Sequence, residues 1–308
     1  MFEKSKTPLS VSNLSFSYGS TKVLKGVSMK LAPAKITAII GKSGSGKSSF
    51  LRLVSGAVSS SFSGLLRIFG RPRLLSTADI AFVSQHPSMF SELSIEHNVI
   101  VCAKLQGVST EQGLSQAHKL ASELGLEVPF DRAPQSLSGG QRVRLNVLLS
   151  LLHDPQLLLL DEPFVGLDFA TRRLLWQFLQ RQVAKKKTVL ITTHLLSEAS
   201  EFADRVVILR DGKVFFQGTP QAFQKKMNVS FVYEARLSSC SEAKQKRVEG
   251  YCASRGIPVL ELSARHLFVA LSSHQQRSGL HTFLSKQNIS FSEISFREPN
   301  LDEVFMCA

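Results

Sequence analysis

Cysteine is scarce in this sequence and follows no pattern. The chain carries four cysteines among 308 residues, without a CxxC pair or a regular spacing. Disulfide frameworks and zinc sites both rest on paired, regularly spaced cysteines, so we expect neither of them. This cysteine usage fits a reducing compartment.

Long apolar runs are missing as well. A membrane-spanning helix needs about 20 consecutive apolar residues, and the richest stretch, 143–160, is broken by the segment HDPQ at 153–156. The first ten residues, MFEKSKTPLS, lack the apolar segment of a signal peptide. We therefore expect a soluble or peripheral protein on the cytoplasmic side.

Acidic residues are outnumbered by basic ones, 24 to 37, which gives a formal net charge of +13. The excess lies in residues 1–227, where 28 Lys and Arg face 16 Asp and Glu, whereas residues 228–308 hold nine against eight. A basic region attracts a nucleotide, a nucleic acid or an anionic membrane surface. Charge alone does not choose among these partners or exclude a simply solvated surface.

The first 227 residues alternate apolar strands with helices. We expect strands at 35–40, 80–84, 157–161 and 188–193, and helices at 48–56, 110–125, 171–184 and 195–203. Strand-like alternation also marks 9–19 and 22–31, and residues 205–218 read as a hairpin turned at Asp211-Gly212. Buried strands alternating with helices predict an α/β domain with a mainly parallel sheet.

Residues 228–308 follow another order: strand, helix, hairpin, helix, strand and a short terminal helix. This order resembles a small ferredoxin-like βαββαβ unit. We therefore divide the chain into a domain at 1–227 and an accessory α+β domain at 228–308.

A glycine-rich loop follows the strand at 35–40. Residues 41–48 read GKSGSGKS, which fits the pattern GxxxxGK[ST] between a strand and a helix. The glycines let the backbone wrap around phosphate groups with its N–H groups turned inward. We predict that Lys47 reaches the β- and γ-phosphates and that Ser48 binds Mg²⁺. The nucleotide-binding residues predicted here are Gly41, Lys42, Ser43, Gly44, Ser45, Gly46, Lys47, Ser48 and Ser49.

The apolar strand at 157–161 ends in two carboxylates, Asp161 and Glu162. Ligands of parallel sheets gather at the carboxyl ends of the strands. We predict that Asp161 binds Mg²⁺, directly or through water, and that Glu162 polarises the attacking water as general base. Alone, such a run is more often a strand that leaves the core, so its value comes from the accompanying motifs.

The segment LSGGQ at 137–141 lies 20 residues before Asp161. It combines a helix-capping serine, two glycines with exposed backbone N–H groups and a following helix, which together form a second anion cradle. The segment resembles the signature of ABC ATPases, which other P-loop enzymes lack, and the resemblance spans roughly residues 9–226. It implies that Ser138, Gly139, Gly140 and Gln141 contact the nucleotide bound by the other subunit of a dimer.

The resemblance implies roles for further residues. Tyr18 matches the aromatic residue that stacks on adenine, and His194 matches the switch histidine at the γ-phosphate. Gln85 matches the glutamine that senses Mg²⁺ and water and touches the membrane subunits. Residues 166–168 match the loop that crosses to the other subunit, hereafter the crossing loop. Phe164 departs from the family pattern, which usually has a small or hydroxyl residue there, so we expect altered packing near the crossing loop and unimpaired hydrolysis.

The tail EPNLDEVF at 298–305 resembles the ending of drug- and lipid-exporter ATPases. Asn300 and Glu303 predict a capping box, and Leu301, Val304 and Phe305 share one helix face. Because the motif is short, an ordinary docking helix remains its alternative reading.

Together, the motifs and the resemblance imply the ATP-hydrolysing subunit of an ABC membrane transporter. The expected fold is α/β: a P-loop core of ABC type with an antiparallel β subdomain and a helical subdomain, plus the small ferredoxin-like domain. ATP and Mg²⁺ are the expected cofactors. Glu162, His194, Gln85 and Lys47 form the expected catalytic set, and Ser48, Gln85 and Asp161 the metal set.

The expected partners are transmembrane permease subunits and a second ATPase, identical or homologous, at the cytoplasmic face of the membrane (the inner membrane in a bacterium). Export is favoured by the tail, and an importer ATPase stays open. A ribosome-associated ABC factor needs two cassettes, and a DNA-repair ATPase needs a long coiled coil before the signature. The sequence shows neither, so no nucleic acid is expected.

Overall fold

The computed structural model describes residues 7–58, 61–72 and 79–307, and the chain divides into two compact units. The first unit comprises Met1–His194 and Glu201–Gln217, and the second comprises Leu195–Ser200 and Gly218–Ala308. Helix α7 (Pro220–Met227) therefore belongs to the second unit, where it contacts the terminal helix, whereas the sequence-based division placed it in the first domain. The domain boundary after residue 227 stays a prediction.

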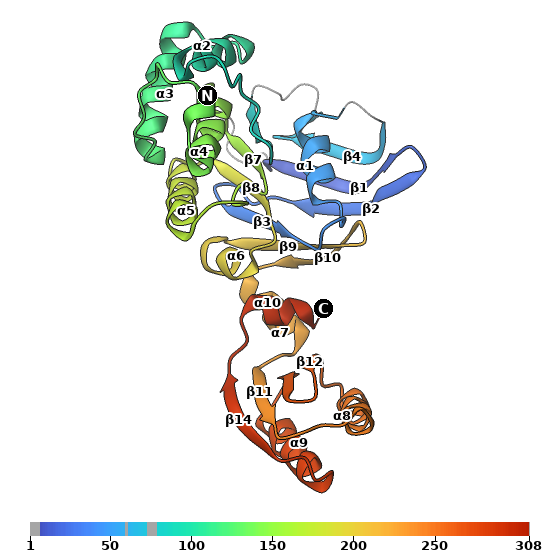
Figure 1. Ribbon diagram of the computed structural model, residues 1–308. Coiled ribbons are helices and arrows are strands. Elements are labelled where there is room, and N and C mark those ends of the chain that lie inside the picture. Colours follow the sequence, from blue (N-terminus) through green and yellow to red (C-terminus); the bar gives the residue numbers. More distant parts are fainter. Residues whose placement is uncertain (1–6, 59–60, 73–78, 308) are drawn as a thin grey trace. The chain divides into compact units, whose positions relative to one another are not determined.

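A six-stranded sheet forms the centre of the first unit (Figure 1). Its strands, in spatial order, are β10 (Lys213–Gly218), β9 (Arg205–Arg210), β3 (Ile36–Ile40), β8 (Thr188–Thr193), β7 (Leu157–Asp161) and β6 (Ile80–Val83). The strands from β9 to β6 are parallel. Every residue of β3, β7 and β8 is buried, as expected for parallel strands covered on both faces.

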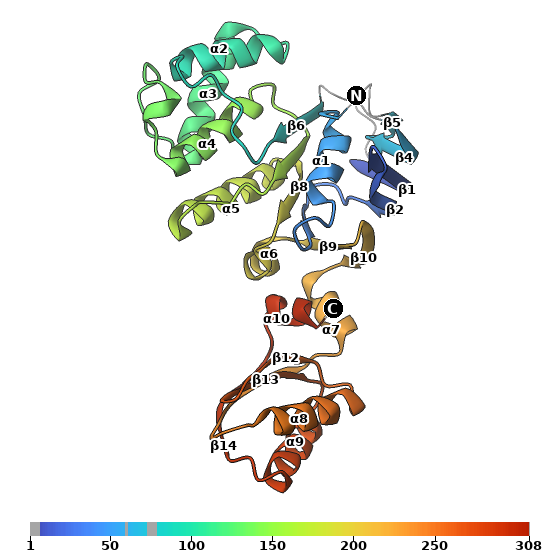
Figure 2. The ribbon, with the colours of Figure 1, turned by 45° about the vertical axis from the view of Figure 1, so that its right-hand side comes forward.

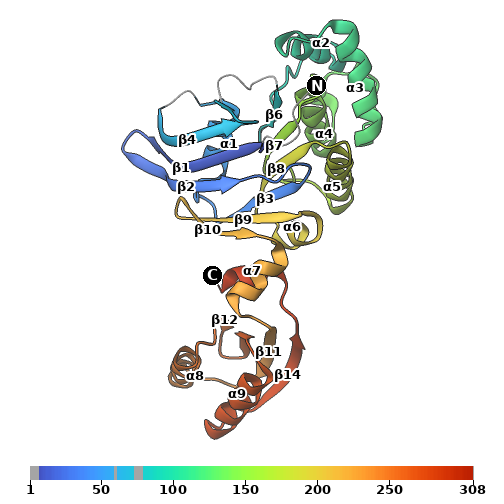
Figure 3. The same cartoon turned by 180° about the vertical axis from the view of Figure 1, so that it is seen from behind.

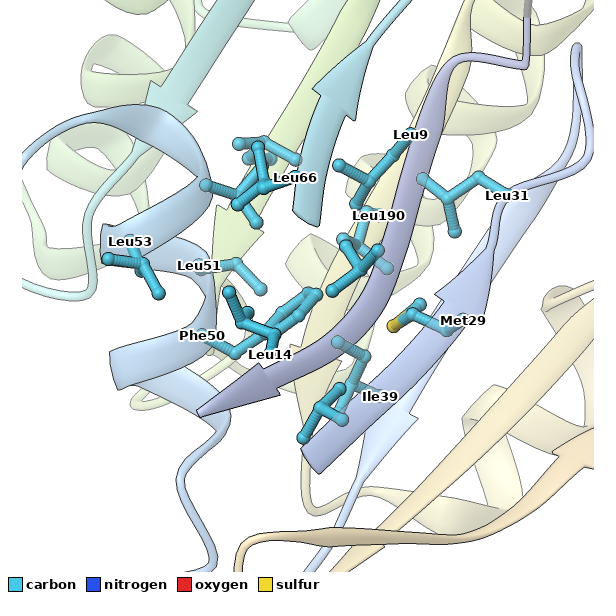
Figure 4. Packing of buried hydrophobic residues seen from close by; sticks show 14 of the residues in the cluster. Leu9, Leu14, Met29, Leu31, Ile39, Phe50, Leu51, Leu53, Leu66 and Leu190 are labelled. Atoms are coloured by element: carbon cyan, nitrogen blue, oxygen red, sulfur yellow. The ribbon is translucent and has the colours of Figure 1, made fainter. Parts of the chain in front are cut away.

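A second, antiparallel sheet packs against the central sheet. Its strands are β2 (Thr21–Lys30), β1 (Leu9–Tyr18), β4 (Phe62–Ile68) and β5 (Arg71–Pro72). In Figure 4, Leu14 and Met29 of this sheet lie in one cluster with Phe50 of α1 (Lys47–Ser55) and with Ile39 and Leu190 of the central sheet. Burying a side chain of this size contributes about 1.5–3 kcal/mol. The cluster therefore fixes α1, and with it the glycine-rich loop, between the two sheets.

Four helices of the first unit begin at a residue whose side chain caps them. They are α2 (Ile95–Leu105), α3 (Thr110–Leu124), α4 (Gly139–Ser150) and α5 (Phe169–Ala184). Their N-cap residues Ser94, Ser109, Ser138 and Asp168 each accept a hydrogen bond from the backbone N–H three residues on. Figure 2 shows α2, α3 and α4 as one group, and α4 contacts β6. This group is the helical subdomain that the sequence predicted.

The second unit has the order β11 (Phe231–Leu237), α8 (Glu242–Ser254), β12 (Val259–Leu262), β13 (His266–Leu271), α9 (His274–Lys286) and β14 (Phe291–Arg297). Its antiparallel sheet has the spatial order β12-β13-β11-β14, the βαββαβ arrangement that the sequence predicted. Val248 of α8 and Leu280 of α9 pack with Val269 of the sheet in one buried cluster. Both helices therefore cover the same core.

The chain ends in α10 (Leu301–Met306), which lies beside α7 in Figures 1 and 3. The predicted capping box is present: the Asn300 side chain accepts from the Glu303 N–H at 2.9 Å, and the Glu303 carboxylate accepts from the Asn300 N–H at 2.8 Å. Val304 is fully buried, whereas the side chain of Leu301 lies outside the described part of the structure. Within the described ranges, no helix combines the length and the apolarity needed to cross a membrane.

Candidate nucleotide site

The glycine-rich loop connects β3 to α1 and wraps around the first side chain of that helix. Gly46 has φ 102°, and a Cβ there would lie 2.9 Å from a methyl of Leu24, so only glycine fits. The Lys47 ammonium donates to the Gly41 carbonyl at 2.8 Å and to the Lys42 carbonyl at 3.4 Å. The loop therefore holds a buried cation at its centre, because Lys47 is only 7% exposed.

Asp161 ends β7 directly behind α1. Its Oδ1 accepts hydrogen bonds from the hydroxyls of Ser48, at 2.9 Å, and Thr192, at 2.7 Å. Its Oδ2 is buried and accepts no hydrogen bond within the described residues. Leaving a carboxylate oxygen buried and unpaired is costly. Carboxylate and hydroxyl oxygens are the ligands that Mg²⁺ prefers, so this donor set fits the metal that the sequence predicts here.

Glu162 turns the chain at the end of the same strand. Its φ is 46°, a left-handed conformation that is rare for residues other than glycine and often occurs at functional sites. Its N–H donates to the Thr192 hydroxyl at 2.9 Å. Its carboxylate lies 2.8 Å from Nδ1 of His194 and 3.5 Å from the ammonium of Lys47. One carboxylate thus bridges His194 and Lys47.

These side chains open into one cavity of about 640 Å³, hereafter the nucleotide cavity. The structure brings together Tyr18, Ser43, Gly44, Gly46, Lys47, Ser48, Ser49, Gln85, Glu162 and His194 as its lining, all of them predicted from the sequence. Gly41, Lys42 and Ser45 support the loop from behind: two of them through carbonyls that hold Lys47, and Ser45 through its N–H to Lys42. The Tyr18 ring is 43% exposed and packs edge-on against Phe16 at 4.8 Å.

Two lining residues, Val23 and Val165, were missed by the sequence reasoning. Val23 begins the apolar alternation of β2 and cannot be distinguished there from a core residue. Val165 follows Phe164 and is 45% exposed. Its closeness to Glu162 in the sequence is the only signal that could have indicated it. Val23 and Tyr18 give the cavity an apolar wall that suits the flat ring of a nucleobase.

The signature segment lies outside the nucleotide cavity. Ser138 and Gln141 form a capping box at the start of α4: the Ser138 hydroxyl accepts from the Gln141 N–H at 3.2 Å, and the Gln141 side chain accepts from the Ser138 N–H at 2.9 Å. A second cavity of about 430 Å³, hereafter the signature groove, is lined by Gly139 and shares Gln85 and Val165 with the nucleotide cavity. A Cβ on Gly139 would meet nothing within 4 Å, so its backbone is open to a ligand.

The crossing loop runs into α5. Gly166 adopts φ 74°, and the Asp168 carboxylate accepts from the N–H and the hydroxyl of Thr171 at 2.8 and 3.1 Å. These two hydrogen bonds hold the pKa of Asp168 below its usual value. The loop is therefore anchored at its carboxyl end, while Val165, the residue before it, is exposed.

Known proteins resemble this chain over most of its length. A family model described as ABC transporter matches residues 24–165. The Nod factor export ATP-binding protein I of Rhizobium johnstonii is 30% identical over 313 residues, which cover 98% of this chain and 94% of that protein. The protein of the same name from Rhizobium etli is 28% identical over 97% of this chain and 92% of its own length.

Solved structures resemble the fold as well. A structure described as the ATP binding subunit of an ABC transporter has a TM-score of 0.65 and 28% identity, over 71% of this chain and 93% of that chain. The cbiO1 protein of Clostridium perfringens, part of the cbiONQ complex, has a TM-score of 0.64 and 26% identity, over 73% of this chain and 95% of that chain. The predicted P-loop α/β fold is confirmed by these likenesses.

Proposed function

The chain belongs to the ABC transporter ATP-binding family, the ATP-hydrolysing subunits that work with transmembrane subunits, and from that membership we propose which residues do the work. In this proposal Glu162 is the general base of hydrolysis and His194 is its partner. The observation that carries it is the 2.8 Å contact between these two side chains at the mouth of the glycine-rich loop. Lys47 and the loop N–H groups bind the terminal phosphates.

Hydrolysis needs a group that accepts the proton of the attacking water and positive charge that neutralises the phosphates, and the cavity offers both. Glu162 takes the proton of the attacking water, and His194 holds the Glu162 carboxylate in position. Mg²⁺, when bound, neutralises phosphate charge; Ser48 and Asp161 would hold it, and Gln85 completes the proposed set. Tyr18 and Val23 contact the adenine ring of the nucleotide. The unpaired Oδ2 of Asp161 is the observation that supports the metal.

Replacing Glu162 with Gln tests the proposed base. The amide keeps the shape but accepts a proton poorly, so Mg-ATP binding should persist while turnover falls at least ~10²-fold. Glu127→Gln, at an exposed carboxylate outside the nucleotide cavity, is the matched control and should turn over as the unaltered protein does. Normal turnover in Glu162→Gln would remove Glu162 from its role.

We further propose a head-to-tail dimer, of two copies or of this chain with a homologue. Its support is that Ser138 and Gly139 do not line the nucleotide cavity of their own chain, although Gly139 is open to a ligand. Exposed apolar side chains next to the crossing loop, Val165 and Phe169 at 45% and 65% exposure, offer a surface to the partner. ATP would then lie between the glycine-rich loop of one subunit and the signature of the other.

A third cavity suggests where a permease segment binds. It measures about 460 Å³ and is lined by residues of β6, α2 and α4, Cys102 among them. Ser84, which directly precedes Gln85 in the sequence, also lines it. We propose that it receives a cytoplasmic segment of the transmembrane subunit, so that Gln85 senses both the nucleotide and the permease. Crosslinking from the native Cys102 to the permease should succeed in the assembled transporter, and Cys102→Ser should abolish it.

The direction of transport is proposed from the relatives. Two proteins that match nearly the whole chain are Nod factor export proteins, and the match includes the C-terminal unit. We propose export at the cytoplasmic face of a membrane. Transport into inverted vesicles by the assembled complex is the test, and ATP-dependent uptake by intact cells would favour the importer alternative.

A further inference from the structure

Three aromatic rings, those of Phe164, Trp176 and Phe202, form a stack in the first unit. The Phe164 ring lies 4.5 Å from the Trp176 ring at an interplanar angle of 23°, and Trp176 lies 5.3 Å from Phe202 at 25°. Phe164 is 3% exposed and Trp176 is fully buried. Phe164 is the residue at which the sequence departs from the expected small or hydroxyl side chain, so the stack accounts for that departure by filling the core.

The outer rings of the stack belong to the two segments that carry the proposed catalytic pair. Phe164 stands two residues after Glu162. Phe202 ends α6 (Leu196–Phe202), the helix that begins two residues after His194. The segments that hold the 2.8 Å contact between Glu162 and His194 therefore both lead to one indole, that of Trp176.

Two turn hydrogen bonds and a few buried side chains hold the segment between Glu162 and the crossing loop. Its two turn hydrogen bonds, Val165 N–H to Glu162 and Leu167 N–H to Phe164, are both long at 3.3 Å. The buried side chains of this segment and of the crossing loop are those of Pro163, Phe164 and Leu167. Glu162 itself has a left-handed backbone, which persists only where the surroundings enforce it. Phe164 is the buried aromatic side chain of this segment, two residues from that strained residue.

We propose that Phe164 and Trp176 are positioning residues for ATP hydrolysis. The stack sets the place of the Glu162 carboxylate against the His194 imidazole and makes the two segments move together. Neither ring lines the nucleotide cavity, so the stack acts on turnover and not on ATP binding. The proposal rests on the roles proposed above for Glu162 and His194.

Phe164→Leu tests the stack because it keeps an apolar side chain and removes the ring. A displacement of the base by about 1 Å can cost on the order of 10²-fold in rate, so kcat should fall roughly 10- to 100-fold while ATP affinity stays within about twofold. Phe178→Leu is the matched control: Phe178 is fully buried in α5 like Trp176, but at another position of the helix. It should lower the melting temperature comparably and leave kcat unchanged.

The conservative variant separates ring stacking from general packing. Trp176→Phe retains an aromatic ring and should keep most of kcat, whereas Trp176→Leu should lose it as Phe164→Leu does. Wild-type kcat in a folded Phe164→Leu, or an equal loss of kcat in Phe178→Leu, would overturn the proposal. The role of Glu162 as general base is tested separately: normal turnover in Glu162→Gln, in which the stack is intact, would disprove that role alone.

A spectroscopic readout is built in, since Trp176 is the only tryptophan of the chain. If nucleotide moves Glu162 and His194, Mg-ATP added to Glu162→Gln should change the Trp176 emission, because that variant holds ATP without turnover. The added change Phe164→Leu should reduce the response by at least about half. An unaltered response in the double variant would contradict the coupling.

Discussion

The two units of this chain differ in where they bury polar groups. Within the described ranges, all but one of the buried Ser, Thr, Asn, Gln, Lys, Asp and Glu side chains belong to the first unit. Among them, Lys47 lines the nucleotide cavity, and Asp161 accepts a hydrogen bond from Ser48 of its lining. The exception, Glu303, is paired with Arg297 and caps α10.

Burying polar groups costs free energy unless they are paired. Each unit leaves at least one buried polar atom unpaired within the described residues, Oδ2 of Asp161 in the first and the hydroxyl of Tyr233 in the second. Of these two residues, only Asp161 is hydrogen-bonded to a residue that lines the nucleotide cavity.

Charge divides the chain in the same way. Residues 1–227 hold 28 basic against 16 acidic side chains, and residues 228–308 hold nine against eight. The net positive charge of residues 1–227 favours the binding of an anionic substrate. The nearly balanced charge of residues 228–308 favours contacts between protein surfaces. We therefore propose that the first unit carries the chemistry and that the second unit serves for contacts.

Removing the buried cation should have the largest effect. Lys47→Ala deletes the charge at the centre of the loop, and a charge-assisted contact of this kind contributes about 1.5–3 kcal/mol, or roughly 10- to 100-fold in ATP affinity. Turnover should fall further, because the same ammonium lies 3.5 Å from Glu162. Lys22→Ala, on the exposed start of β2, is the control. Unchanged ATP binding and hydrolysis in Lys47→Ala would place the nucleotide elsewhere.

A mixed dimer tests whether the signature works across subunits. Lys47→Ala and Ser138→Arg should each be nearly inactive as homodimers, because one loses the phosphate cation and the other fills the open cradle. A mixed dimer keeps one composite site with both halves intact. Random mixing should therefore restore roughly a quarter of the ATPase activity. If nothing is restored although a crosslink shows that mixed dimers form, catalysis is not independently shared between the two sites.

Much of the first unit could be predicted from local patterns. Asp211 and Gly212 both have positive φ, as the predicted two-residue hairpin turn requires. The capping boxes at Ser138 and Asn300 follow from spacing alone. These features depend on residues within four positions of one another, and such signals survive in a single sequence.

Features that join distant segments could not be predicted. The pairing of β1 with β4 joins strands across more than one intervening element, and no local pattern records that register. Val165 lines the nucleotide cavity only because the left-handed turn at Glu162 directs the chain there. The inclusion of α7 in the second unit likewise depends on its contact with α10 at the other end of that unit.

Truncation after Met227 sharpens the division between chemistry and contact. The shortened chain keeps every residue of the nucleotide cavity, so ATP affinity should stay within about threefold if it remains folded. Dimerisation or coupling to transport should weaken, and kcat should fall more than affinity, since residues 195–200, directly after His194, group with the second unit. Nucleotide titration beside sedimentation measures both. A folded truncation without ATP affinity would show that the second unit belongs to the binding site.

The smallest effect concerns pH and the second unit alone. His266 lies between two carboxylates, with Nε2 at 2.8 Å from Glu234 and Nδ1 at 3.1 Å from Glu261. The hydrogen bond with Glu234 raises the pKa of His266, and the same bond lowers the pKa of Glu234. The histidine contribution to stability is therefore complete below its unfolded pKa of about 6.5 and is lost as pH rises through the raised folded value.

Glu234 has the opposite sign: its contribution is present above its unfolded pKa of about 4.3 and is lost as pH falls through the lowered folded value. The pair is thus most stabilising between about pH 4.5 and 6.5, by less than about 1 kcal/mol because the groups are partly exposed. His266→Gln should lower the melting temperature of the full chain in that window and not near pH 9, where both proteins should melt alike. His86→Gln, at an exposed histidine of the first unit, should show no such window. A deficit in His266→Gln that grows as pH rises would mean that the imidazole acts there in its neutral form, by packing and not by charge.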